Sequence, residues 1–266
     1  MNRIILSLST LLAPFFVLGH EGMWLPTVLE SIQDDMQAMG LRLSAEDIYA
    51  INNSSIKDAV VLFGGGCTAE VISDQGLILT NHHCGFGAIL SHTTVENDRM
   101  KNGFWALGLE DELFSAGVSA TFVVRMEDVT EAMLSVRKQL KEGEDLTFQM
   151  DLRARQLADS AVQGTHYEAV VRPFNYENSY FLIVTEKFSD VRLVGTPPSA
   201  IGKFGGDTDN WMWPRHTGDF SLFRIYAGND NKPAEYAEGN VPFRPRHALP
   251  LALYGAEPGD FAMIFG

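Results

Sequence analysis

The sequence is poor in cysteine and has no cluster of basic residues. Only two of its 266 residues, Cys67 and Cys84, are cysteines. Its 20 Lys and Arg residues face 34 Asp and Glu residues, which gives a formal net charge of -14. Because phosphate binding needs gathered Lys and Arg, this balance argues against a nucleic acid as a partner. The acidic residues are spread along the chain, which is typical of charge that serves solubility.

Long apolar runs are also scarce, and the one at the N-terminus predicts a targeting segment. Residues 4–18 carry no charge and follow Arg3. The run has the length of a signal-peptide core and is short for a membrane span. We expect a signal peptide over residues 1–19, with a retained membrane anchor as the alternative. No later stretch is long and apolar enough to span a bilayer, so residues 20–266 should form the exported, folded part.

The hydrophobic pattern predicts a mostly β protein with accessory helices. Helical spacing marks residues 29–39, which end at Gly40, and Ser44 with Asp47 resembles a capping box for a short second helix. A longer helical stretch covers residues 127–162 and is interrupted at Gly143. Patterns typical of strands cover residues 59–80, 167–172, 180–186, 191–194, 220–226, 248–253 and 261–265. The last of these is so apolar that it should have a following partner, so we expect an N-terminal piece of a longer protein.

The most specific chemistry surrounds the second cysteine. Residues 80–85 read TNHHCG and directly follow an apolar stretch. A histidine just before a cysteine, with another cysteine one hairpin upstream, is the layout of the base-bearing segment in chymotrypsin-like serine peptidases. We therefore take His83 as the candidate general base and His82 as the weaker candidate. Such a base is needed because a serine hydroxyl is a poor nucleophile until an imidazole takes its proton.

The two cysteines have two possible uses. In an exported chain, an even pair at this spacing predicts a Cys67–Cys84 disulfide, which would stabilise the fold by ~3 kcal/mol. The alternative is a zinc hydrolase site that uses the cysteines with His82 and His83. Adjacent histidines in an extended segment point to opposite faces, which disfavours a shared tetrahedral ion.

Asp219 is the candidate partner of the base. It opens an apolar strand well after the histidine, in the order found in chymotrypsin-like enzymes. A simple turn residue at a strand entry is the other interpretation. No serine lies in a Gly-x-Ser-x-Gly or Gly-Asn-Ser-Gly frame, and Ser199 lacks flanking glycines. The sequence thus supplies a base and an orienting carboxylate, but no recognisable nucleophile in this chain.

Residues 205–216 gather glycines, carboxylates, an amide and two tryptophans in one loop. Its oxygens could accept hydrogen bonds from a substrate ammonium group, and an indole face could add a cation–π contact. The alternatives are a tryptophan-anchored surface loop, or a calcium site at Asp207 and Asp209. Calcium loops need more oxygen ligands at alternate positions than this stretch offers.

These motifs together resemble one family closely. Residues 64–68, 80–85, 95–98, 102–104, 203–220 and 226–228 are similar to those of the bacterial S46 dipeptidyl peptidases, the family of dipeptidyl peptidases 7 and 11. The resemblance covers residues 21–266. It implies a chymotrypsin-like double β-barrel, of which this chain would hold the N-terminal part. It also implies a homodimeric, periplasmic or cell-surface enzyme that takes peptides with a free N-terminus and uses no metal or organic cofactor.

The resemblance also implies roles for single residues. By position, His83 matches the family's base and Asp219 its carboxylate, while Asn210 and Trp211 match residues that hold the substrate's amine. In the family, the nucleophilic serine and the residue that selects acidic or hydrophobic P1 side chains lie further downstream. We therefore expect the N-terminal portion of an exported serine dipeptidyl peptidase. The alternative is a catalytically silent peptide-binding protein that keeps the amine-recognition loop.

Overall fold

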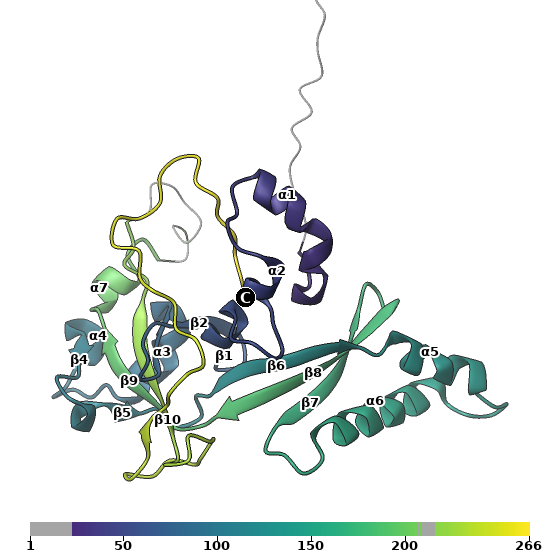
Figure 1. Ribbon diagram of the computed structural model, residues 1–266. Coiled ribbons are helices and arrows are strands. Elements are labelled where there is room, and N and C mark those ends of the chain that lie inside the picture. Colours follow the sequence, from purple (N-terminus) through teal and green to yellow (C-terminus); the bar gives the residue numbers. More distant parts are fainter. Residues whose placement is uncertain (1–22, 207, 209–215) are drawn as a thin grey trace, which may run out of the picture.

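The computed structural model describes residues 23–206, 208 and 216–266 (Figure 1). The expected signal peptide, residues 1–19, lies outside these residues, as do Asn210 and Trp211. The strands are β1 (Val60–Phe63), β2 (Cys67–Val71), β3 (Leu77–Thr80), β4 (Phe104–Trp105), β5 (Leu113–Phe114), β6 (Ala120–Asp128), β7 (Glu168–Phe174), β8 (Ser179–Phe188), β9 (Val191–Thr196), β10 (Ser221–Ala227) and β11 (Val241–Pro242). The α-helices are α1 (Gln33–Ala38), α2 (Ala45–Ile48), α3 (His82–Ser91), α4 (Arg99–Asn102), α5 (Thr130–Gln139), α6 (Leu146–Val162) and α7 (Ser199–Gly202), and the 3-10 helices are η1 (Pro26–Ile32), η2 (Ile56–Ala59) and η3 (Leu109–Asp111).

The strands form one antiparallel sheet, which agrees with the mostly β prediction. Its order is β4-β9-β10-β3-β2-β1-β6-β8-β7, with β5 added on β9 and β11 on β10. One face of the sheet covers the main core, in which Ile78, Phe188 and Phe223 are fully buried. Burying a side chain of this size stabilises a fold by about 1.5–3 kcal/mol, so this layer fixes the strand register.

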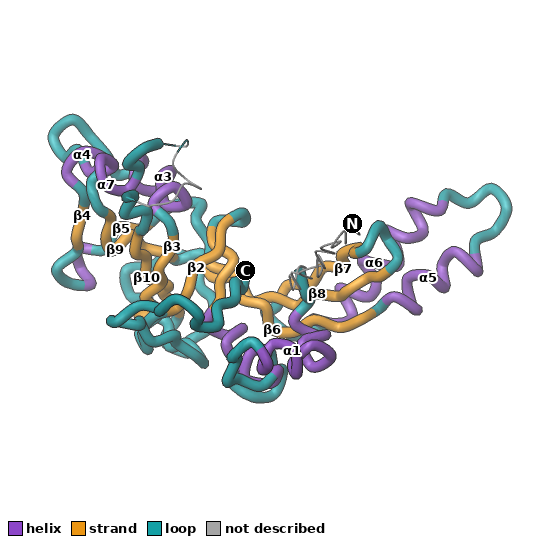
Figure 2. Tube along the Cα trace, turned by 90° about the horizontal axis from the view of Figure 1, so that it is seen from above, coloured by secondary structure: helices purple, strands orange, loops and turns teal. Residues whose placement is uncertain are grey.

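Different helices pack against the two ends of the sheet, as Figure 2 shows. At one end β6, β8 and β7 extend outward and carry α5 and α6, which pack through a second core with Met133 and Leu182. At the other end α3, α4 and α7 gather beside β3, β9 and β10 (Figure 2). Of the candidate site residues, His82, His83 and Asp219 belong to this second end.

The N-terminal helices follow the sequence prediction. The helical stretch begins as η1, continues as α1 and ends before Gly40, whose φ of +112° suits a residue without a Cβ. The capping box is present, since the Ser44 side chain accepts from the Asp47 amide while Asp47 accepts from the Ser44 amide. A small core of Leu29, Leu41 and Ile48 holds these helices together.

Three predicted segments need correction. The helix expected from residue 127 begins only at α5, because β6 stays paired with β8 as far as Asp128, opposite Phe181. Residues 248–253 form no strand; Pro250 lacks an amide proton, and one bond, from the Leu249 amide to the Val71 carbonyl, ties the segment to the sheet. Residues 261–265 form no strand with any described strand, and Ile264 is exposed.

The interruption at Gly143 is confirmed. Gly143 has φ +89° and lies between α5 and α6. The second helix then begins at a capped residue, since the Asp145 carboxylate accepts from the Phe148 amide at 3.0 Å. In the described part of the chain, no helix has both the length and the apolar composition needed to cross a membrane.

Candidate active site

The register of two strands brings the candidate base and carboxylate together. Antiparallel β3 and β10 pair with Thr80 opposite Ser221. Strand β3 ends at Thr80 and β10 begins at Ser221. The residues that follow β3 and the residues that precede β10 therefore lie at the same edge of the sheet. His83 and Asp219 lie there, although 136 positions separate them in sequence.

Two hydrogen bonds join this pair. His83 Nδ1 lies 2.7 Å from Asp219 Oδ2, and the His83 backbone amide donates to Asp219 Oδ1 at 3.1 Å. A carboxylate accepts only, so the His83 ring carries its proton on Nδ1 and presents a lone pair on Nε2. The Asp219 side chain is 7% exposed and that of His83 is 54% exposed. The arrangement places a buried carboxylate behind an accessible imidazole, which is the geometry that proton abstraction by a histidine requires.

Asn81 holds the carboxylate from the other side. Its side-chain amide donates to the Asp219 carbonyl at 3.1 Å and lies 3.5 Å from Oδ2. The Asn81 carbonyl in turn accepts from Ser221 Oγ at 2.9 Å. The last residue before α3 and the first residue of β10 are thereby linked around Asp219. Asn81 was not predicted as a site residue. The feature of the sequence that could have indicated its role is its position directly before the two histidines.

The disulfide prediction is confirmed. Cys67 at the start of β2 and Cys84 in the first turn of α3 are bonded, with their Cα atoms 6.1 Å apart. The bond fixes the start of α3 to the sheet one residue after His83. The two histidines, which were expected in an extended segment, instead begin a helix at His82.

The zinc alternative meets a chemical obstacle. Possible ligand atoms of Cys67, His83 and Cys84 lie within 4.8 Å of one another. However, the two sulfurs are bonded to each other, and zinc binds cysteine as a thiolate. His82, the fourth residue of that alternative, points elsewhere.

His82 is fully buried and faces α7. Its Nδ1 lies 3.0 Å from Thr196 Oγ1 and its Nε2 lies 3.2 Å from Ser199 Oγ. Burial lowers its pKa below the ordinary 6.5; the charge of Asp219 opposes this shift, and the positive charge of Lys203 adds to it. The ring is thus held neutral, with both nitrogens bonded, so His82 differs from His83 in both exposure and partners.

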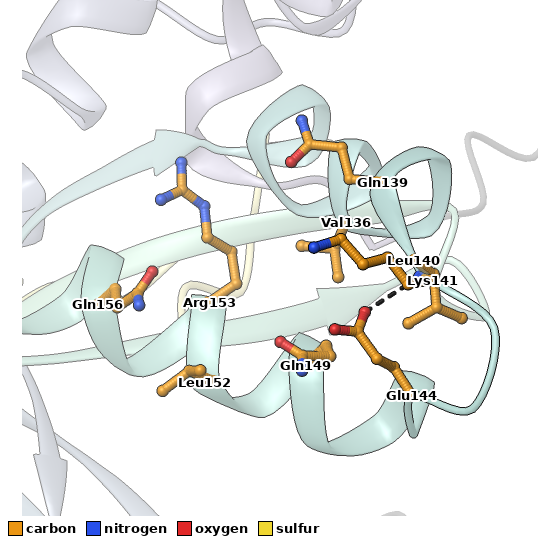
Figure 3. A pocket seen from close by; sticks show the side chains of 9 residues that line it. All are labelled: Val136, Gln139, Leu140, Lys141, Glu144, Gln149, Leu152, Arg153 and Gln156. Atoms are coloured by element: carbon orange, nitrogen blue, oxygen red, sulfur yellow. Dashed lines mark hydrogen bonds between the residues drawn. The ribbon is translucent and has the colours of Figure 1, made fainter.

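A surface hollow among the described residues lies away from His83 and Asp219. It occupies about 210 Å³ between α5 and α6, near the loop that joins them. Figure 3 shows Arg153, Gln149 and Glu144 along one side, and the Lys141 amide bonded to the Glu144 carboxylate. It belongs to the outer helical pair and not to the end of the sheet that holds His83.

The peptidase S46 family model matches residues 19–266. The chain belongs to the peptidase S46 family. Its curated relatives include an Asp/Glu-specific dipeptidyl-peptidase of Capnocytophaga gingivalis, 49% identical over 92% of this chain and 35% of the relative. A dipeptidyl-peptidase 7 of the same organism is 45% identical over 100% of this chain and 38% of its own length.

Solved S46 structures share the fold. The crystal structure of Porphyromonas endodontalis DPP11 in complex with the dipeptide Arg-Glu is 42% identical, with a TM-score of 0.82 over 90% of this chain and 36% of its own. The chain therefore spans about a third of the length of the S46 relatives it matches.

Proposed function

We propose that this chain is the N-terminal part of an exported serine dipeptidyl peptidase that releases dipeptides from peptides with a free N-terminus. In it, His83 is the general base and Asp219 is the carboxylate that orients it. The serine nucleophile comes from a part of the protein beyond these 266 residues. The signal peptide over residues 1–19 directs the protein to the periplasm or the cell surface.

The observation that carries the proposal is the 2.7 Å contact between His83 Nδ1 and Asp219 Oδ2. The carboxylate fixes the ring tautomer, so Nε2 accepts the serine proton and later returns it to the leaving amine. Asp219 also stabilises the imidazolium cation that forms between these steps. The disulfide at the next residue, Cys84, limits the displacement of the base, which matters because small errors in position are costly.

The S46 relatives support the substrate class. Two of them are named for dipeptidyl peptidase activity, and the crystal structure of another protein, Porphyromonas endodontalis DPP11, contains the dipeptide Arg-Glu. In this proposal Asn210 and Trp211 bind the substrate's ammonium group, so cleavage is counted two residues from the end. An amide oxygen can accept from the ammonium, and an indole face attracts it.

The complete protein is proposed to be a homodimer with a chymotrypsin-like double β-barrel. The antiparallel strands β1, β2, β3, β9 and β10, with His83 and Asp219 at one edge, are consistent with the N-terminal share of such a barrel. Residues 20–266 would form this share of the peptidase domain.

The test is a cleavage assay on the full-length protein. A hexapeptide is offered with a free amino end and, in parallel, with an acetylated end, and the products are identified by mass spectrometry. Release of the N-terminal dipeptide from the first substrate alone supports the proposal. Release of single residues, cleavage of the blocked peptide at a comparable rate, or binding without cleavage would contradict it. The last result would favour the silent peptide-binding protein.

A further inference from the structure

We infer that His82 is a positioning residue that holds Asp219 against His83 by way of the short helix α7. This inference rests on the proposed function, because it concerns how the same pair is kept in place.

The first step links His82 to α7. Thr196 ends β9 and Ser199 begins α7, and each hydroxyl lies within hydrogen-bond distance of one ring nitrogen of His82. Gly202, the last residue of α7, lies against the ring so closely that a Cβ there would be 2.5 Å from His82 Cγ. No side chain fits in that space, so the helix backbone rests directly on the imidazole.

The second step links α7 to the carboxylate. The Gly218 amide donates to the Ile201 carbonyl at 3.0 Å, which ties the residue before Asp219 to α7. A Cβ on Gly218 would lie 2.8 Å from Ile201 Cγ2. This contact, like that of Gly202 with the His82 ring, leaves no room for a side chain. Helix α7 therefore contacts the His82 ring through Gly202, and it contacts Gly218, the residue before Asp219, through Ile201.

The third step links the carboxylate back to the start of α3, where His82 lies. His82 and His83 are neighbours at the start of α3, and Asp219 accepts from both the ring and the amide of His83. If the His82 ring lost its bonds, α7 could shift, and Gly218 and Asp219 would move with it. A displacement of the orienting carboxylate should lower the rate of the chemical step more than substrate binding.

The experiment removes the partner bonds while leaving His82 in place. In the full-length protein, Ser199→Ala and Thr196→Val each delete one hydroxyl with little change in volume. Active sites are titrated with a fluorophosphonate, so that kcat is expressed per reactive site. We expect kcat to fall about tenfold in each variant with KM changed less than about twofold. His92→Gln, at a partly buried histidine that caps the opposite end of α3, is the control and should leave both constants near those of the parent.

A double-mutant cycle separates positioning from general stability. His82→Phe keeps the ring volume and removes both nitrogens, so Ser199→Ala should cost less than about twofold in that background. Unchanged kcat in both hydroxyl variants, or an equal loss in His92→Gln, would overturn the inference. If His82→Phe does not fold, the two hydroxyl variants decide alone. Failure of the proposed function is distinguishable, because it would appear as turnover that survives the loss of His83 itself.

Discussion

Asp219 accepts two hydrogen bonds from His83, one from the ring and one from the backbone amide of the same residue. The amide bond fixes the carboxylate relative to the start of α3, and the ring bond fixes the imidazole relative to the carboxylate. Both depend on the pairing of β3 with β10, which ends at Thr80 and Ser221. A local contact is thus set by the register of two strands far apart in sequence.

Replacing the carboxylate by an amide tests its electrostatic role. Asp219→Asn keeps the shape but can no longer enforce the Nδ1 proton or stabilise the imidazolium. We expect kcat of the full-length protein to fall by about 10⁴, as in other triads that lose this charge. Steady-state kinetics with a fluorogenic dipeptide substrate gives the value. Asp230→Asn, at an exposed aspartate, is the matched control; a loss below tenfold in Asp219→Asn would contradict the assignment.

The disulfide should contribute measurably to stability. Cys67→Ser combined with Cys84→Ser removes a crosslink across a sequence separation of 17 residues. The expected cost is about 3 kcal/mol in the free energy of unfolding, because the unfolded chain gains freedom. Urea denaturation with and without a dithiol reductant measures it. Reductant should destabilise the parent and leave the double variant unchanged; equal sensitivity of both would rule out this role.

A buried ion pair at the start of β9 offers a second stability test. Asp190 is fully buried and accepts from Arg192 through two bonds of 2.9 Å, and from Asn240 at 2.9 Å. Arg192→Ala leaves that carboxylate buried without its cation, so we expect a loss of about 3–5 kcal/mol. Arg137→Ala breaks the exposed pair with Glu177 and should cost less than about 1 kcal/mol. Similar losses of unfolding free energy in both variants would show that burial does not determine how much an ion pair contributes to stability.

His82 makes the stability depend on pH in a defined direction. Burial lowers its folded pKa below the ordinary value of 6.5, so the unfolded chain binds the proton first as the pH falls. The stabilisation is complete above about pH 6.5 and is lost as the pH falls from there toward the folded pKa. Urea midpoints at about pH 7.5 and 5.5 should therefore differ more in the parent than in His82→Gln. Equal differences in the two proteins would contradict this account.

The sequence predicted those features that depend on local pattern or on residue type. The capping box at Ser44, the break at Gly143 and the Cys67–Cys84 bond all appear as expected. The pairing of His83 with Asp219 was expected from the order of the two residues along the chain and from the family resemblance, whereas the register of β3 and β10 that makes the contact is a long-range property. Sequence spacing alone carries no such information.

Other features depend on tertiary contacts that no local pattern reveals. Residues 248–253 are apolar enough for a strand, but the sheet places only Leu249 in bonding reach and Pro250 offers no donor. The bonds from His82 to Thr196 and Ser199 cross more than a hundred positions. The glycine at position 202 is the trace that this contact leaves in the sequence. Glycine occurs for too many other reasons to reveal the contact.

The most direct test of the account compares two histidines that each face a carboxylate. His83 lies 2.7 Å from Asp219, and His166 lies 2.6 Å from Glu186 on the outer hairpin. In the full-length protein, His83→Ala should abolish dipeptide release, while His166→Ala should leave kcat within about twofold of the parent. Near-normal turnover in His83→Ala would show that another group is the base and would contradict the central claim.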